Sequence, residues 1–314
     1  MVVFLVFAAF VVAYANGANA NFKGVGSLLG SETTSYRVAV FWGTCTTAAG
    51  CLAAIFLAPT LLKAFSGKGL VPDALIDRPA FLSAVAAGAA LTGCLATRLG
   101  FPISTTHMLT GALLGAGWAA GQVHVAKLWG SFLQPLLLSP PLAILAGAAV
   151  FLILKMLRLA PDHRTRWLDA AHFLSAGAVC FARGLNDTPK MAALLPGVGC
   201  LEGSRGMILV AVAVTLGGGL SARAVADTLA YKITGMNPGQ GFAANLATAL
   251  LVTTASVHGL PVSTTHVSVG SLLGIGLTTR QARWRTAWPV LGAWVITLPV
   301  SALVAALLFK LLSR

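Results

Sequence analysis

Two hexapeptides in this chain carry a run of three hydroxyl side chains shortly after a proline, P-I-S-T-T-H at 102–107 and P-V-S-T-T-H at 261–266. Proline suits the start of a helix, and Ser and Thr side chains can cap the free amides of a first turn. Hydroxyl donors beside unpaired amides at the positive end of a helix form a site suited to a tetrahedral oxyanion. The alternative is a capped helix whose hydroxyls bond only to their own chain, and the presence of two copies favours the binding site.

A second pair of motifs reads G-x-N-x-x-x-K, at 17–23 and 184–190. Gly and Asn accept left-handed or turn conformations, which would let a helix break and expose its backbone polar groups. The amides of Asn19 and Asn186 can donate and accept hydrogen bonds, so they could serve an anion or a cation. Asp187 is an ionisable group in apolar sequence, which favours a functional role over a self-contained i,i+3 ion pair.

Four basic side chains belong to the same motifs. Lys23 and Lys190 are interpreted equally well as functional groups or as parts of structural ion pairs. His107 and His266 could relay protons near neutral pH, but a role as neutral donors that hold broken helices is favoured.

The motifs recur in the same order, which indicates an internal repeat. The G-x-N motifs lie 167 positions apart and the S-T-T motifs 159, and each S-T-T motif is followed by G-x-L-L-G-x-G. The sequence therefore predicts a duplicated unit, with a first repeat at 1–157, a linker at 158–166 and a second repeat at 167–314.

The composition places these repeats in a membrane. Only 9% of the 314 residues are charged, whereas 57% are hydrophobic, which excludes both a soluble domain and a disordered chain. We expect an all-α integral membrane protein with about 8–12 membrane segments. Apolar stretches of spanning length lie at 1–16, 37–62, 79–99, 131–157, 168–183, 206–232, 241–257 and 287–311, and shorter ones lie at 103–120 and 262–278.

The loops predict the orientation. The net charge of +13 comes mainly from basic residues in short breaks between apolar runs, which indicates cytoplasmic loops in a lipid bilayer and not a nucleic-acid partner. The linker 158–166 and the arginines at 280–285 should be cytoplasmic, whereas 118–130, with only Lys127, should lie outside. Because equivalent loops lie on opposite sides of the membrane, the two repeats should be inverted relative to each other. Both chain termini should then lie outside.

Inverted repeats with broken or re-entrant helices are typical of secondary transporters, whose site lies near the midplane where the halves meet. The segments 17–35 and 184–200 are the expected breaks. No ATP-binding or hydrolase motif occurs, and the five cysteines lack paired spacing, so the sequence predicts neither an enzyme nor a metal or cofactor site. The alternative from another class is a membrane enzyme that uses His107, His266 and Asp187 as a metal or acid–base site.

The G-A-N, G-L-N-D-T-P-K and paired P-[IV]-S-T-T-H motifs resemble the PiT family of inorganic phosphate transporters along essentially the whole chain. This resemblance implies a transporter that moves inorganic phosphate across the cytoplasmic membrane by alternating access, driven by Na⁺ or H⁺. The implied coupling-cation candidates are Asp187, Asn19 and Asn186. The implied substrate-binding residues are Asn19, Ser104, Thr105, Thr106, Asn186, Asp187, Ser263, Thr264 and Thr265.

The chain departs from the family pattern at one functional position. The first signature of the family usually reads G-A-N-D, but this chain has Ala20 in place of the Asp. The loss of a carboxylate that would hold a cation or a proton leaves Asp187 alone, and it predicts a changed coupling stoichiometry or ion. Sulfate or another tetrahedral oxyanion is the alternative substrate, and the sequence is compatible with a homo-oligomer.

Overall fold

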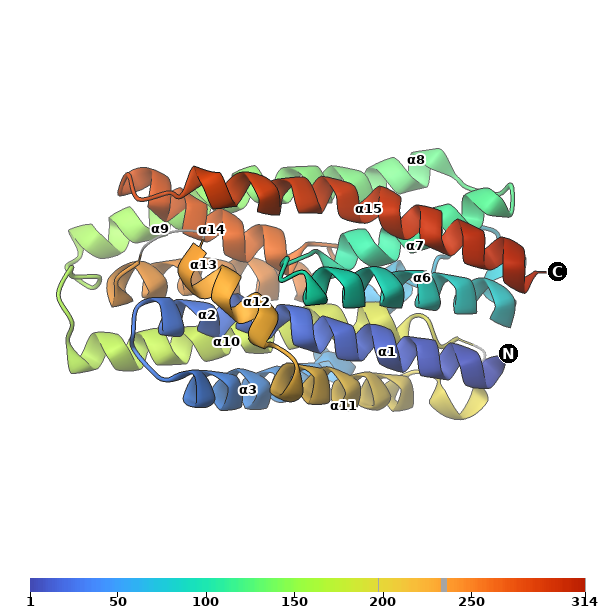
Figure 1. Cartoon of the computed structure of the whole chain (residues 1–314), viewed down its shortest axis with the longest axis horizontal. Coiled ribbons are helices and arrows are strands. Elements are labelled where there is room, and N and C mark those ends of the chain that lie inside the picture. The colour runs from blue at the N-terminus through green and yellow to red at the C-terminus, as the bar shows by residue number, and fades with distance from the viewer. Residues whose placement is uncertain (197, 233–235, 314) are drawn as a thin grey trace.

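In the computed structural model, which describes residues 1–196, 198–232 and 236–313, the described chain is helical and contains no β-strand. Long helices run side by side along the long axis of the molecule (Figure 1). Both chain termini lie at one end of the bundle, and the connection between α9 and α10 lies at the opposite end (Figure 1).

The helices of the first half follow the apolar stretches of the sequence. They are α1 (Val2–Ala20), α2 (Phe22–Gly30), α3 (Tyr36–Leu57), α4 (Pro59–Ala64), α5 (Asp73–Ile76), α6 (Pro79–Arg98), α7 (Thr105–Ala119), α8 (Val125–Leu128), the π-helical turn η1 (Trp129–Leu133) and α9 (Gln134–Met156).

The second half has the same order of long helices. Its elements are α10 (Arg166–Ala192), the 3₁₀ turn η2 (Gly199–Leu201), α11 (Ser204–Leu220), α12 (Arg223–Asp227), the π-helical turn η3 (Thr228–Lys232), α13 (Pro238–Val257), α14 (Thr264–Thr278) and α15 (Trp284–Leu312).

The protein is a multi-pass membrane protein. Five helical stretches in the described residues are long and apolar enough to cross a membrane, or six if α11 and α12, bent by 64°, form one span. α10 and α13 have spanning length at 27 and 20 residues. α7 and α14 have 15 residues each, about 22 Å of helix, which is shorter than the roughly 30 Å of hydrocarbon. These four helices bring the membrane segments into the predicted range.

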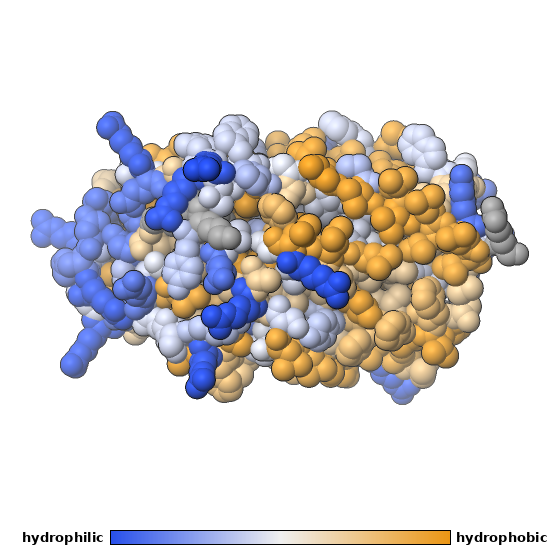
Figure 2. Space-filling view, viewed as in Figure 1, coloured by the Kyte–Doolittle hydropathy of each residue, from blue (hydrophilic) through white to orange (hydrophobic). Residues whose placement is uncertain are grey.

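The surface is divided along the same axis. Figure 2 shows apolar residues over the part of the bundle that ends in the termini, and hydrophilic residues gathered at the end that carries the α9–α10 connection. The loop after α7 lies at the end with the termini, whereas the loop after α14 lies at the opposite end (Figure 1). Equivalent loops on opposite ends confirm that the two repeats are inverted.

The repeats interlock and do not fold side by side as separate bodies. α1 packs on α11 while α10 packs on α3, and α7 packs on α15 while α14 packs on α9. The sequence repeat equates α1 with α10, α3 with α11, α7 with α14, and α9 with α15, so each contact has its counterpart after exchange of the halves. The centre of the bundle therefore has an approximate twofold axis.

The prediction that the helices break at the G-x-N motifs themselves is wrong. α1 continues into α2 with only Asn21 between them, and Asn21 has helical dihedral angles of −58° and −35°. α10 runs unbroken through 184–190. Residue 197, in the second expected break, lies outside the described residues. The re-entrant elements are instead α7 and α14, which start in the interior of the bundle.

Close helix crossings explain the motif glycines. A Cβ atom on Gly17 would lie 2.1 Å from the carbonyl oxygen of Val214, and one on Gly184 would lie 2.4 Å from that of Thr47. Both crossings are equivalent in the repeat, α1 on α11 and α10 on α3. Small residues let membrane helices approach closely, so these glycines are needed for packing and not for a turn.

Candidate functional site

The N-termini of α7 and α14 meet in the interior of the protein. Ser104 is the N-cap of α7, and its hydroxyl accepts a hydrogen bond from the amide of His107 at 3.2 Å. Ser263 caps α14 in the same way, with the amide of His266 at 3.2 Å. The two serines thus satisfy orphan amides of their own helices, as the capped-helix alternative predicts.

The last threonine of each motif ties the two half-length helices together. Thr106 Oγ1 donates to the carbonyl oxygen of Val262 at 2.9 Å, and Thr265 Oγ1 donates to that of Ile103 at 2.6 Å. Each bond is the repeat equivalent of the other, because both join the second helical residue of one motif to the residue before the serine of the other. The two N-termini are therefore fixed to each other across the approximate twofold axis.

The first threonine of each motif faces the ionisable groups. Thr105 Oγ1 lies 2.6 Å from Asn16 Nδ2, which donates to it, and 3.4 Å from Asp187 Oδ2. Thr264 Oγ1 accepts a hydrogen bond from Lys23 Nζ at 3.3 Å. These hydroxyls consequently lie where the two repeats and the buried charges come together.

The two motif asparagines support the start of the half-length helices. Asn19 Nδ2 donates to the carbonyl oxygen of Phe101 at 2.9 Å and to Thr97 Oγ1 at 3.1 Å, while its Oδ1 accepts from the amide of Ile103 at 3.0 Å. In the other half, Asn186 Nδ2 donates to Ser256 Oγ at 2.8 Å. Both side chains hold the ends of the preceding helices, which shapes the loops that lead into α7 and α14.

Both motif lysines reach the opposed helix starts. Lys190 Nζ donates to the carbonyl oxygen of Val262 at 2.8 Å, to Thr106 Oγ1 at 2.9 Å and to Asn186 Oδ1, and lies 3.4 Å from Asp187 Oδ1. Lys23 Nζ makes the equivalent contact with the carbonyl oxygen of Ile103 at 3.4 Å. The Asp187–Lys190 ion pair exists, but it is one part of a network that includes both S-T-T motifs.

Asn16 and Arg183 also belong to this network, although the motif analysis did not include them. They precede the two G-x-N motifs at equivalent positions. Asn16 Nδ2 donates to Asp187 Oδ2 at 3.1 Å, and Arg183 donates from one terminal nitrogen to Asn16 Oδ1 at 3.3 Å. Arg183 is an ionisable residue within an apolar stretch, which is the signal that could have identified it.

The imidazole rings of the two histidines lie beside each other, and in the part of the chain that the structure describes these rings are not hydrogen-bonded to the S-T-T hydroxyls. The ring centroids of His107 and His266 are 4.7 Å apart, and the His266 ring lies 4.2 Å from that of Trp294. Ser139 Oγ lies 3.1 Å from His266 Nδ1. Within the described residues, no three His, Cys, Asp or Glu side chains are grouped to hold a metal ion, so His107, His266 and Asp187 are not assembled as a metal site.

The site is enclosed and its charge is asymmetric. All nine residues that the sequence assigns to it are at most 5% exposed. The buried lysines, Lys23 and Lys190, and the guanidinium of Arg183 face a single buried carboxylate, Asp187, in the part of the chain that the structure describes. The positive ends of α7 and α14 point to the same place, so the arrangement attracts an anion.

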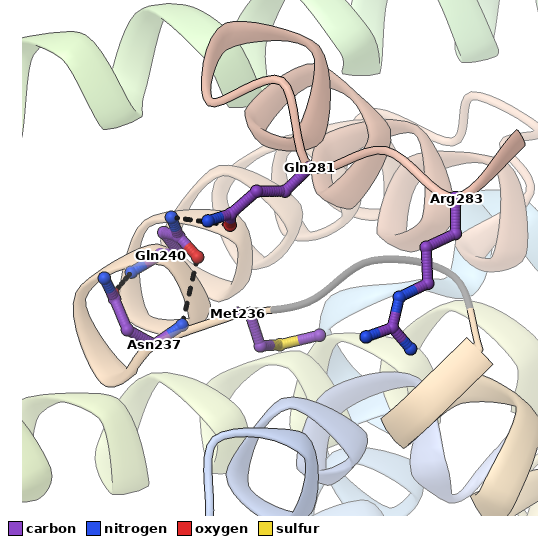
Figure 3. A pocket seen from close by; sticks show the side chains of 5 residues that line it. All are labelled: Met236, Asn237, Gln240, Gln281 and Arg283. Atoms are coloured by element: carbon purple, nitrogen blue, oxygen red, sulfur yellow. Dashed lines mark hydrogen bonds between the residues drawn. The ribbon is translucent and has the colours of Figure 1, made fainter.

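A hollow at the surface is separate from this site. It is lined by Met236 and by polar side chains from the start of α13 and the loop after α14 (Figure 3). Asn237 and Gln240 form a capping box, and Gln240 Nε2 donates to Gln281 Oε1 at 3.3 Å. Arg283 donates to the carbonyl oxygen of Tyr231. The capping box and the bond from Gln240 to Gln281 fix the start of α13, so these polar groups serve the fold.

Comparisons with known proteins give a consistent result. Residues 16–305 match the model of the "Phosphate transporter family". The chain is 27% identical over 312 residues to a "Probable low-affinity inorganic phosphate transporter" of Rhizobium meliloti (strain 1021), covering 94% of this chain and 92% of that relative. A protein of the same name from Bacillus subtilis (strain 168) is 30% identical over 231 residues, covering 68% and 69%.

The fold is also found in a solved structure. "The sodium-dependent phosphate transporter" superimposes with a TM-score of 0.87 over 99% of this chain and 98% of that one, at 19% identity. At this level of identity the likeness shows the fold alone.

Proposed function

The chain belongs to the phosphate transporter family, and from this membership we propose that it carries inorganic phosphate across the cytoplasmic membrane as a secondary active transporter. The observation that supports the proposal most strongly is the meeting of the α7 and α14 N-termini in an enclosed interior lined by hydroxyls and cations. Helix N-termini bind tetrahedral oxyanions through backbone amides and the positive end of the dipole.

The nine proposed site residues have two roles. Thr105, Thr264 and Asp187 face the centre and are the groups closest to a bound anion and its coupling ion. The other six, Ser104, Thr106, Asn19, Ser263, Thr265 and Asn186, hold the two helix starts in place. Substitution of the second group changes the geometry of the site without removing a direct contact.

Alternating access follows from the interlocked repeats. The site is closed while Thr106 is bonded to Val262 and Thr265 to Ile103. Movement of α7 with its partner α15, or of α14 with its partner α9, separates the two helix starts and breaks these bonds. Because the repeats are inverted, the two movements expose the site to opposite sides of the membrane.

The coupling ion is Na⁺ or H⁺, and Asp187 is the carboxylate that takes it. Asp187 is the buried carboxylate among the described residues, and Lys190 lies 3.4 Å from it. Lys190 therefore competes with a cation for this group. A protein that shares the fold is called sodium-dependent, which supports Na⁺ as the first ion to test.

The topology has the linker 158–166 in the cytoplasm between repeats 1–157 and 167–314, with both termini outside. The basic residues at the linker end support this orientation. A reporter fused to the C-terminus should be accessible only from outside, and a cytoplasmic reporter would contradict the orientation. We propose that the protein is a transporter and not an enzyme.

The function is tested with the purified full chain in proteoliposomes. Uptake of radiolabelled phosphate is measured under a Na⁺ gradient and under a proton gradient, imposed separately, with sulfate as competitor. We expect saturable, gradient-driven uptake that is lost in Asn19→Ala and in Asn186→Ala. Absence of gradient-driven phosphate uptake would contradict the proposal, and currents too large for a carrier cycle would indicate a channel.

A further inference from the structure

Arg183 has a buried guanidinium that is only partly hydrogen-bonded within the residues that the structure describes. It is 1% exposed in the middle of α10. One terminal nitrogen donates a hydrogen bond to Asn16 Oδ1, whereas Nε and the other terminal nitrogen have no partner among the described residues. A guanidinium stays charged in proteins, and a buried charge without a partner destabilises the fold strongly. A ligand for these donors would explain why Arg183 is present.

The repeat explains why Arg183 has no carboxylate partner among the described residues. Asp187 lies one helical turn after Arg183 and accepts a hydrogen bond from Asn16, the repeat equivalent of Arg183. The equivalent of Asp187 in the first repeat is Ala20, one turn after Asn16. A carboxylate at position 20 would therefore face Arg183 as Asp187 faces Asn16, and this chain has a methyl group there.

The ionisable groups of the buried interior are mostly basic. Among the described residues that are buried, Lys23, Arg183 and Lys190 are basic, and Asp187 is the one carboxylate. The N-termini of α7 and α14 add further positive potential. A doubly charged anion would interact more favourably with this excess of basic groups than a singly charged anion.

We propose that Arg183 binds the transported oxyanion directly through its free Nε and terminal nitrogen, and that it gives the site a preference for doubly charged tetrahedral oxyanions such as hydrogen phosphate and sulfate. The oxyanion takes the place of the carboxylate that is absent at Ala20. This inference rests on the proposed function, since it adds to the same site a binding residue and a preference for the charge of the anion.

The test compares three variants of the full chain in proteoliposomes. Arg183→Gln should raise the KM for phosphate by about 10- to 100-fold, as expected for loss of hydrogen bonds to a charged group, with a smaller effect on kcat. Arg183→Lys, which keeps the charge but not the planar group, should raise KM less. Arg205→Gln removes an exposed arginine at the start of α11 and should leave KM unchanged.

Competition between anions provides a readout that a structural role would not change. Sulfate and perchlorate are both tetrahedral, but sulfate carries two charges and perchlorate one. Sulfate should compete with phosphate at least tenfold better than perchlorate in the unmodified protein, and this ratio should fall in Arg183→Gln. An unchanged KM and an unchanged ratio in Arg183→Gln, or equal competition by the two anions in the unmodified protein, would overturn the proposal.

Thermal unfolding separates binding from folding. Without phosphate, Arg183→Gln should be at least as stable as the unmodified protein because a buried charge without a carboxylate partner is removed, and a given phosphate concentration should stabilise it less. A loss of stability with phosphate protection retained would show a structural role. If Arg183→Gln does not fold, Arg183→Lys and the anion competition decide the question. If the unmodified protein binds radiolabelled phosphate without transporting it, the proposed function fails while these binding measurements still test Arg183.

Discussion

Replacement of Ala20 by Asp should supply Arg183 with the internal partner that the first repeat lacks. Ala20 is buried on α1, one turn after Asn16, and Asn16 is hydrogen-bonded to Arg183 at 3.3 Å. A buried carboxylate is ordinarily destabilising, but here it meets a guanidinium that is already buried and unpaired. The sign of the effect on stability is therefore reversed relative to an ordinary buried charge.

The size of the effect follows from the bonds that would form. A hydrogen bond to a charged group contributes about 1.5–3 kcal/mol, so Ala20→Asp should stabilise the phosphate-free protein by an amount of this order. The same pair competes with phosphate for Arg183, which should weaken phosphate binding by about 10- to 100-fold in the absence of a coupling cation.

A double-mutant cycle checks the assignment. Thermal unfolding and radiolabelled phosphate binding are measured for Ala20→Asp, Arg183→Gln and the double variant, with and without Na⁺. We expect the stabilisation by Asp at position 20 to disappear when Arg183 is replaced, because the two effects depend on one contact. The reasoning is refuted if Ala20→Asp destabilises the protein to the same extent whether or not Arg183 is present.

Two further substitutions address the helices around the site. Thr106→Val and Thr265→Val each remove one hydrogen bond between the starts of α7 and α14, which contributes about 0.5–1.5 kcal/mol to the closed state. The two variants should shift the labelling of introduced cysteines toward opposite sides of the membrane. A shift toward the same side in both variants would contradict the inverted arrangement. Gly17→Ala and Gly184→Ala place a Cβ 2.1 Å and 2.4 Å from a carbonyl oxygen and should abolish folded protein, as size-exclusion chromatography would show, whereas Gly219→Ala, with its nearest atom at 3.9 Å, should be tolerated.

The repeat and the S-T-T helices could be predicted because their signal is local. Three hydroxyls after a proline specify a capped helix start, and the structure confirms the helix starts at Thr105 and Thr264. The inversion was also predictable, since it follows from which of two equivalent loops carries the arginines. The assignment of substrate-binding roles to these residues stays a prediction.

The role of the motif glycines was not predictable from one sequence. Glycine permits both a positive φ and a close helix crossing, and the sequence around Gly17 and Gly184 does not distinguish these uses. Only the packing of α1 on α11 and of α10 on α3 shows that the crossing is the reason. Arg183 is visible in the sequence as an ionisable residue in an apolar stretch, but only the structure shows that two of its nitrogens have no partner among the described residues.

The most direct test of the central claim concerns the first threonine of each S-T-T motif. Thr105 and Thr264 come from opposite repeats and have their hydroxyls among the buried charges. Radiolabelled phosphate uptake into proteoliposomes is measured for Thr105→Val and Thr264→Val, with Thr215→Val as the control, because the Thr215 hydroxyl bonds only within α11 in the described contacts. A single site between the repeats predicts that both motif variants lose uptake and the control retains it. Uptake that persists unchanged in both motif variants would contradict a phosphate site at the meeting of α7 and α14.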